Sequence, residues 1–454
     1  MPLPTAGLTH GASNSKVMNQ PLAMSEDSPL LGVLRRQQVI AVLRAATFVG
    51  SLLVAWISLR PFIDLAELDL ADASTGNDTM TYAVFGGLAL LVGALTIPGN
   101  RRGLATLLSA RFLIFGGWIV VSVVLSTDPA VSIKRFALTA AAAAVASMMF
   151  FLPRSQSEMA RWFSVAVLGL LATCYLGILF APNLSIHLAT DLQEPLLAGD
   201  WRGVFGHKNV AAAMMVMMLF LGVYAASSGL WTAGLVSAAM ALVFLVNAGG
   251  KSALALGVFT FALSSLTAIV RSFWLRAIML LSPLLLLNML SVGTVMSDRL
   301  AAIAAAMPFD TSFTGRTEIW IFALQSLQPR LALGYGFAAF WGTGATRSTP
   351  EGMEWAATVA HSHNGYLDTA LAMGLPGLVL LIAVLVIMPL RDFHAADRGG
   401  NNGPLTLAFL RLWLFGIYLA AFESFFLDRA DPIWFTFLIA VFGLHYLARF
   451  RAAA

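Results

Sequence analysis

The sequence predicts an all-α polytopic membrane protein with about twelve transmembrane helices. Hydrophobic residues make up 59% of the 454 positions and charged residues only 11%, and the mean hydropathy is +0.81. A soluble domain does not need so much apolar surface. Apolar runs that approach the roughly 20 residues needed to cross a bilayer recur along the chain.

The sequence predicts two regions, a polar N-terminal tail and a membrane domain that contains all of these apolar runs. The polar residues 1–34 lack the compact apolar core of a signal peptide, so we expect a disordered cytoplasmic tail followed by a membrane domain over 35–454. The predicted spans are 39–59, 80–97, 112–126, 136–152, 162–181, 209–226, 231–247, 252–270, 277–296, 365–390, 405–423 and 432–448.

Basic residues predict the orientation of these spans. With the N-terminus inside, arginines fall in the inner loops, as the positive-inside rule requires. An even number of spans then returns the C-terminus to the cytoplasm. The arginines of the predicted inner loops are Arg35, Arg36, Arg101, Arg102, Arg154, Arg161, Arg271, Arg276, Arg391, Arg398, Arg449 and Arg451.

Composition also argues against several classes of function. The net charge of +4 comes without a basic stripe carrying interleaved aromatic residues, so no nucleic-acid partner is expected. The single cysteine, Cys174, cannot form an intrachain disulfide or a cysteine metal cluster. Gly249-Gly-Lys-Ser252 lacks the Walker spacing and a preceding strand, which argues against an NTPase. The span centres are almost free of charge, which disfavours a transporter.

One predicted outer loop, 297–364, is much longer than the others. It contains Thr314-Gly-Arg-Thr-Glu-Ile-Trp and then an apolar-periodic run that ends at Pro329. This periodicity predicts an amphipathic helix that lies on the membrane or caps the bundle. Its apolar face consists of Ile319, Phe322, Ala323, Ser326 and Leu327.

Polar residues gather in four outer clusters. The first is Trp201–Asn209 at the start of the sixth span, and the second places Lys251 at the start of the eighth. The third is Gly315-Arg-Thr-Glu318, and the fourth is His361–Asn364. Cations on the outer face oppose the positive-inside rule, so an anionic ligand such as a phosphate is one explanation for them. The alternative is that they meet lipid headgroups or pair with Asp191, Glu194 and Asp200.

Together the four clusters resemble a known family. The pattern Arg-Gly-x-Phe-Gly-His-Lys-Asn, a Lys-Ser element, Thr-Gly-Arg-x-x-x-Trp and His-Asn-Gly-Tyr-Leu is similar to the O-antigen ligase and Wzy-type polymerase superfamily. Within it, the exopolysaccharide polymerase branch of the succinoglycan type is the most similar. The resemblance covers roughly 200–380 and the twelve-span layout.

The resemblance implies an activity and roles for individual residues. It implies a glycosyltransferase of the bacterial inner membrane that joins undecaprenyl-pyrophosphate-linked repeat units at the periplasmic face, without metal or other cofactor. His363 would be the general base, and Arg316 and Arg202 would hold the pyrophosphate. Further substrate-binding candidates are His207, Lys208, Asn209, Lys251, Glu318, Asn364 and Tyr366.

The chemistry of glycosyl transfer from a sugar pyrophosphate is compatible with these roles. A sugar pyrophosphate needs its leaving charge neutralised, which suits arginine, and the incoming hydroxyl needs a base, which suits neutral histidine. Trp320 and Tyr366 are candidates to stack on sugars, and Asp368 and Glu318 are candidates to orient His363 or the arginines.

Two alternatives remain open. One is a ligase that moves the finished glycan to lipid A core or another acceptor, and the other is a transporter for the lipid-linked sugar. Candidate partners are the membrane lipids, a chain-length regulator and the export machinery.

Overall fold

The computed structural model describes residues 29–65, 79–192, 194–306, 316–347 and 359–451. By internal contacts the chain divides into two units, Met1–Leu43 and Arg44–Ala454. Helix α1 (Pro29–Ile57) crosses this division and begins within the predicted 1–34 tail, most of which lies outside the described residues. The second unit carries everything discussed below.

A helix occupies each of the twelve predicted spans. The described residues contain no strand. They do contain an isolated antiparallel β-bridge between Ile186 and Trp201. The helices at the predicted spans are α1, α3 (Thr79–Thr96), α5 (Ala110–Val124), α6 (Pro129–Met148), α7 (Gln156–Phe180), α8 (Lys208–Ser227), α9 (Trp231–Asn247), α10 (Lys251–Leu266), α11 (Phe273–Leu290), α16 (Gly365–Leu381) with its continuation through η7 (Ile382–Ile387) to α17 (Met388–Arg398), α18 (Pro404–Leu419) and α19 (Pro432–Leu447).

Length divides these helices into two groups. In the described part of the chain, seven helices are long and apolar enough to cross a membrane. An eighth crossing results if Arg101–Leu108 and Ala110–Val124, which meet at a 58° bend, form one span. The apolar helices α9, α10, α18 and α19 are shorter, at 16 or 17 residues. The all-helical class is therefore confirmed for the described residues, and the candidate spans agree with a polytopic membrane protein. Twelve crossings and their orientation stay predictions.

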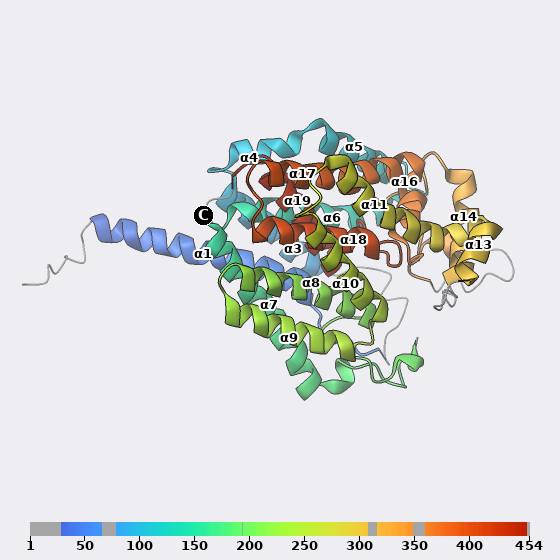
Figure 1. The fold of residues 1–454 in the computed structure, drawn as a ribbon, viewed down its shortest axis with the longest axis horizontal. Coiled ribbons are helices and arrows are strands. Elements are labelled where there is room, and N and C mark those ends of the chain that lie inside the picture. The colour runs from blue at the N-terminus through green and yellow to red at the C-terminus, as the bar shows by residue number, and fades with distance from the viewer. Residues whose placement is uncertain (1–28, 66–78, 193, 307–315, 348–358, 452–454) are drawn as a thin grey trace, which may run out of the picture. The chain divides into compact units, whose positions relative to one another are not determined.

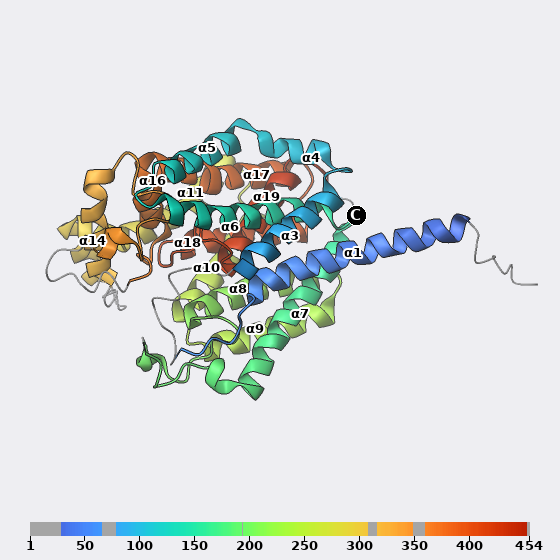
Figure 2. The same ribbon diagram turned by 180° about the vertical axis from the view of Figure 1, so that it is seen from behind.

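Helices α8, α18 and α19 form the interior of the second unit. They pack on one another, and α10, α7 and α6 pack around them (Figure 1). Every residue of α18 from Leu405 to Leu419 except Leu407 is buried. The reverse view shows α3 and α6 side by side on the other face (Figure 2). Helices buried all round are expected at the centre of a multi-span bundle.

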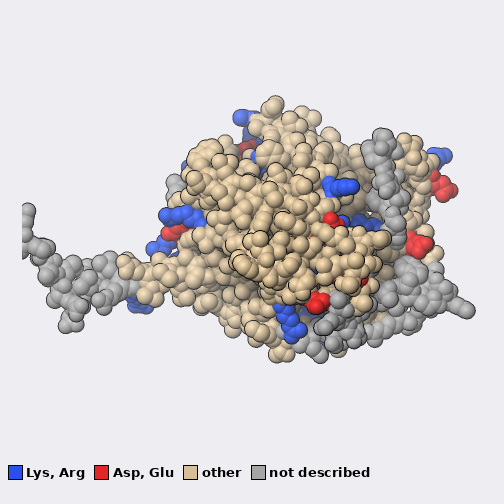
Figure 3. All heavy atoms as spheres, turned by 90° about the horizontal axis from the view of Figure 1, so that it is seen from below, with Lys and Arg blue, Asp and Glu red and all other residues tan. Residues whose placement is uncertain are grey.

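The outside of the bundle is apolar, as lipid contact requires. Side chains such as Leu90, Val258 and Ile278 are 63–77% exposed on the surfaces of α3, α10 and α11. The face drawn in Figure 3 is mostly uncharged, with Lys, Arg, Asp and Glu in small groups. One arginine departs from the expectation of charge-free span centres. Arg411 lies midway along α18, where it is buried, donates to Ser264 Oγ at 3.1 Å and sits 4.3 Å from the Phe261 ring.

The long loop between α11 and α16 carries several short helices. They are α12 (Gly293–Met296), α13 (Asp298–Ala305), α14 (Arg316–Leu327), η5 (Gln328–Arg330) and α15 (Gly344–Arg347). The predicted helix after Thr314 is thus confirmed as α14. Its apolar side, with Phe322, Ala323 and Leu327, packs on α16, so α14 caps that helix (Figure 1).

Helix α16 is broken in its second half. Gly374 has φ 68° and ψ −178°, which is not helical, and Pro376 follows two residues later. The loop segment 331–336 occupies the break: Tyr335 N donates to Leu371 O at 2.7 Å, and Leu375 N donates to Leu331 O at 2.8 Å. Backbone groups freed inside a membrane protein must find partners within the protein, and here the loop supplies them.

We expect Gly374→Ala to destabilise the protein. An added Cβ would lie 2.6 Å from the carbonyl carbon and oxygen of Ala332 and would sit on a residue with positive φ. This combination of positive φ and ψ near 180° is essentially restricted to glycine and costs an L-residue about 1–3 kcal/mol, so we expect the thermal midpoint in detergent to fall by about 2 °C or more. Gly87→Ala is the matched control, because a Cβ there meets no atom within 4 Å. Equal midpoints for the two variants would contradict this account.

Candidate functional site

His363 lies in the turn that leads into α16. Its backbone has φ 56°, an uncommon conformation for a non-glycine residue. The turn is held by Asn364, which caps α16: its Oδ1 accepts from Tyr366 N at 3.1 Å and Leu367 N at 2.9 Å. The same side chain donates to Ala421 O at 3.1 Å. Such strain persists only where the surroundings fix the backbone, and it is common at active sites.

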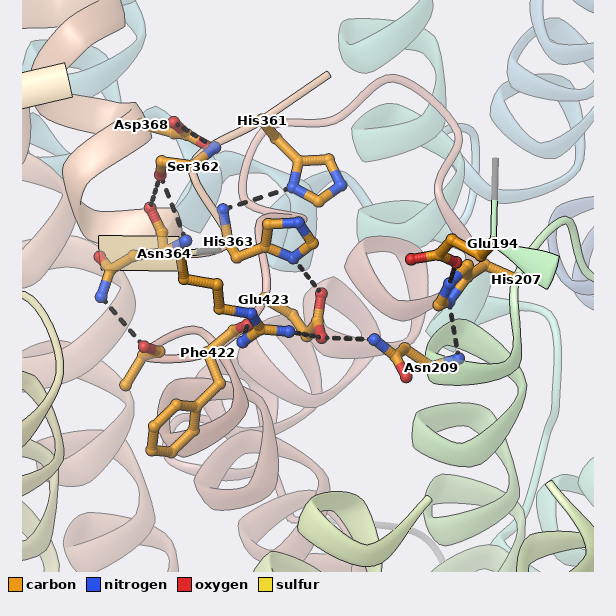
Figure 4. A network of polar contacts seen from close by, with 12 residues as sticks. Glu194, His207, Asn209, His361, Ser362, His363, Asn364, Asp368, Phe422 and Glu423 are labelled. Carbon is orange, nitrogen blue, oxygen red and sulfur yellow. Dashed lines mark hydrogen bonds and ion pairs between the residues drawn. The ribbon is translucent and has the colours of Figure 1, made fainter. Parts of the chain in front are cut away.

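Glu423 is the carboxylate at the centre of the site. It lies just beyond α18, and three residues from distant parts of the chain contact it (Figure 4). His363 Nδ1 is 3.4 Å from Oε2. Arg316 Nη2 donates to Oε1 at 3.2 Å and Asn209 Nδ2 donates to the same oxygen at 3.0 Å.

Arg316 is fixed by a second contact as well. Its Nη1 donates to the carbonyl oxygen of Phe422 at 2.7 Å, so the guanidinium spans the backbone and side chain of neighbouring residues. The side chains of Arg316, Glu423 and His363 are 22%, 18% and 29% exposed. The cluster is therefore half-buried, with one side of each group open.

Glu423 remains ionised in this setting. Burial alone would raise the pKa of its carboxyl, but the hydrogen bond from His363 and the charge of Arg316 outweigh burial and hold the pKa at about 2. Burial and, second to it, the electrostatic influence of His363 lower the pKa of His361, whose ring centroid lies 4.2 Å from that of His363. The site thus combines a carboxylate, a guanidinium and two imidazoles. The charge of Glu423 is paired with that of Arg316.

Two histidines cap the start of α8 and so position Asn209. His207 Nδ1 accepts from Asn209 N at 3.0 Å, while its Nε2 contacts Glu194 (Figure 4). His187 Nε2 accepts from Lys208 N at 3.2 Å, and its Nδ1 lies 2.9 Å from Asp191 Oδ2. Burial lowers the pKa of His187, which favours the neutral ring that this capping needs.

Three predicted phosphate-binding cations lie away from Glu423. Arg202 is 1% exposed and donates to backbone carbonyls, to Ile63 O at 2.7 Å and Phe205 O at 3.3 Å. Lys208 Nζ pairs with Asp200 Oδ2 at 2.6 Å. Lys251 is exposed at the first turn of α10. The structure therefore shows a structural contact for Arg202, and its predicted pyrophosphate contact stays a prediction.

The predicted sugar-stacking residues are covered in this structure. Tyr366 is 8% exposed and its hydroxyl donates to Ile417 O at 2.8 Å. Trp320 is fully buried and donates to Ser362 O at 2.9 Å. Neither ring presents an open face to a ligand.

Asp368 and Glu318, the two carboxylates expected to orient His363 or the arginines, form no hydrogen bond or ion pair with those residues in the part of the chain that the structure describes. Asp368 accepts from Trp341 Nε1 at 2.8 Å and from Ser362 N at 3.2 Å, and Glu318 is exposed in the first turn of α14. Glu423 has the orienting position instead. The sequence signal for it is modest: a single acidic residue at the outer end of the long apolar run 405–423.

Among the described residues, no group of three or more His, Cys, Asp or Glu side chains is arranged to hold a metal ion. The site is thus built of acid, base and cation side chains, and metal independence stays a prediction.

Fold and site together define a class: an all-helical, polytopic membrane protein with a histidine–carboxylate–arginine centre at one end of its bundle. Comparison with known proteins narrows it. Residues 213–382 match the family model described as O-antigen ligase. The exopolysaccharide production protein ExoQ of Rhizobium meliloti (strain 1021) is 29% identical over 99 residues, which is 21% of this chain and 23% of that protein. The resemblance to the O-antigen ligase and Wzy-type polymerase superfamily is confirmed, although the match spans about a quarter of the curated relative.

We expect Glu423→Gln to destabilise the site. Without the carboxylate charge, the half-buried Arg316 keeps its charge and loses its counterion. Breaking a buried ion pair costs about 3–5 kcal/mol, and partial exposure lowers this to roughly 1–3 kcal/mol. The thermal midpoint of the purified protein measures the effect, with Glu318→Gln as a control because Glu318 is exposed. A midpoint as high as that of the control would show that Glu423 does not stabilise this centre.

Proposed function

We propose that this protein is a glycan polymerase of the bacterial inner membrane. It joins undecaprenyl-pyrophosphate-linked repeat units into exopolysaccharide at the periplasmic face, and it uses His363 as the general base. The observation that supports this most directly is the convergence of His363 and Arg316 on Glu423. These residues come from three separate segments, and two of them were expected to perform the two tasks of the reaction.

Glu423 equips His363 for proton abstraction. A carboxylate near Nδ1 favours the tautomer that carries its proton there, which leaves the Nε2 lone pair free. When Nε2 takes the proton of an acceptor hydroxyl, the carboxylate stabilises the imidazolium that forms. The pKa of about 2 keeps Glu423 ionised for this role.

The transfer then balances as a single displacement. The acceptor oxygen forms a bond to the anomeric carbon, the bond from that carbon to the pyrophosphate oxygen breaks, and the proton resides on His363. Arg316 neutralises the charge that develops on the leaving pyrophosphate, because guanidinium matches phosphate oxygens in a bidentate geometry. Direct attack of this kind inverts the anomeric centre.

A ligase is the second candidate, since the matching family model is described as O-antigen ligase. The chemistry at His363 and Arg316 is the same, and the acceptor differs. Polymerase and ligase are distinguished by the lipid-linked intermediate that accumulates when the protein is absent.

His363→Ala should abolish polymer while leaving a folded protein in the membrane, because no other base contacts Glu423 among the described residues. The measurement is made in a strain that lacks the protein, complemented with wild type or variant, by sizing surface glycan and analysing the undecaprenyl-linked pool. His394→Ala is the matched control, since it removes a histidine of α17 far along the chain from α16's start.

The lipid-linked pool separates the candidates. Single repeat units on the outer leaflet support polymerisation, and long polymer on the carrier supports ligation. Repeat units confined to the cytoplasmic side would indicate a transporter. High-molecular-weight product from His363→Ala would rule out the general-base role.

Arg316→Lys should retain the charge and lose most activity. Lysine offers a point charge and cannot contact Phe422 O, Glu423 and a phosphate with one planar group. We expect polymer formation to fall by about tenfold or more, as for loss of one transition-state charge contact. Full activity of Arg316→Lys would exclude bidentate recognition of the pyrophosphate at this residue.

A further inference from the structure

A cavity of about 270 Å³ lies next to the His363 site. His361 lines it, and the His361 ring stacks edge-on against the ring of His363 with 4.2 Å between centroids. Neither Arg316 nor Glu423 lines the cavity, so it is separate from the proposed pyrophosphate contact and joined to it through the two histidines.

Two residues of the cavity wall each carry a polar atom that is shielded from solvent and unsatisfied. Arg429 Nε and Ser424 Oγ are buried and have no hydrogen-bond partner in the part of the chain that the structure describes. Buried polar atoms nearly always have hydrogen-bond partners, and a bound group or water is one explanation for an exception. Both atoms lie in the segment after α18, and both residues line this one cavity.

The backbone of that segment is strained as well. Leu427 has φ 61° and Arg429 has φ 31°, which are left-handed values for non-glycine residues. The segment is anchored from α6, where Thr139 Oγ1 donates to Leu427 O at 3.2 Å. Strain held in place beside an unsatisfied donor is typical of a ligand site.

Cations face the cavity from two different elements. Arg135 on α6 lines it and donates to Ala338 O, and Arg429 lines it from the segment after α18. Asp428 Oδ1 is 3.9 Å from Arg429 Nε, beyond hydrogen-bond distance. The other lining carboxylate, Asp368, is occupied by Trp341 Nε1 and Ser362 N. Arg135 therefore has no carboxylate at hydrogen-bond distance among the described residues, and Arg429 has one long ion pair with Asp428.

The remaining wall suits a saccharide. The aromatic side chains that line the cavity are Phe337, Phe340, Trp341 and Phe426. Sugar rings present apolar faces that pack on such groups, and polar side chains between them fix orientation. At the boundary with the site, burial and His363 lower the pKa of His361, so this wall carries a neutral ring.

We propose that this cavity binds the end of the acceptor saccharide, and that Arg135 and Arg429 pair with a carboxylate substituent on it. The inference rests on the proposed function and specifies its acceptor as an acidic saccharide. A sugar seated here would place a neighbouring hydroxyl toward the His361–His363 pair. On binding, the side chains of Ser424 and Arg429 would turn toward the sugar, and their unsatisfied atoms would gain the hydrogen-bond partners they lack.

The test compares two disaccharides that differ in one group, cellobiouronic acid and cellobiose, with the purified full-length protein in nanodiscs. Saturation-transfer NMR titration gives both affinities. Wild type should bind the acid about tenfold more tightly, the ratio that one charge-assisted hydrogen bond supports. Arg135→Gln and Arg429→Gln should bring the ratio close to one. Arg299→Gln, which removes an exposed cation outside the cavity, should leave it unchanged.

Ser424→Ala is a second test, and we expect the fold to tolerate it. The hydroxyl that it removes has no hydrogen-bond partner among the described residues. It should weaken binding of the acid by about threefold. Equal affinities for the two sugars in wild type, or a preference that all three cavity variants retain, would overturn the proposal. Tighter binding of inorganic pyrophosphate than of the acid, lost in the same variants, would assign the cavity to the lipid phosphate and also overturn it.

The outcomes separate this inference from the proposed function. Wild-type protein that forms polymer but shows no preference for the acid refutes the cavity assignment alone. Wild-type protein that prefers the acid but fails to restore polymer to the deletion strain refutes the polymerase proposal and, with it, the acceptor role of the cavity.

Discussion

The ionised carboxylate of Glu423 is the interaction on which the site depends. It accepts hydrogen bonds from Arg316 and Asn209 and contacts His363, so it ties together α14, α8 and the turn before α16. A carboxylate at this depth is costly unless it is paired and hydrogen-bonded. Three partners meet that requirement, and the pairing holds His363 and Arg316 in a fixed relation.

Several side chains around Glu423 cap the N-termini of neighbouring helices. Asn364 caps α16, while His207 and His187 cap α8 through ring nitrogen atoms that accept backbone N–H groups. Each imidazole is fixed by a carboxylate on its other nitrogen. The consequence is that Asn209 projects from a capped helix end and His363 from the turn that Asn364 fixes, and such supported positions hold side chains more accurately than free loops do.

The sequence predicted the helices well and the site in part, for physical reasons. Long apolar runs predict helices directly, and each of the twelve predicted spans contains a helix. The clusters expected at the outer ends of spans included His363, Arg316 and Asn209, which the structure brings together at Glu423. Glu423 was missed because its partners lie 60, 107 and 214 positions away, and such contacts leave no local pattern. Arg202 was expected to hold the pyrophosphate, but its guanidinium is buried and donates to the carbonyl oxygens of Phe205, three positions away, and of Ile63, 139 positions away.

The break in α16 separates the helix into two mechanical parts. The first half carries the site, and the segment 331–336 fastens its end through Leu371 and Ala372. Trp118 Nε1 of α5 adds a bond of 3.0 Å to Met373 O. A bilayer of different thickness acts on a helix by tilting or displacing its apolar length. Because the break is bonded to its neighbours, tilt of the second half need not shift His363 at the start of the first half.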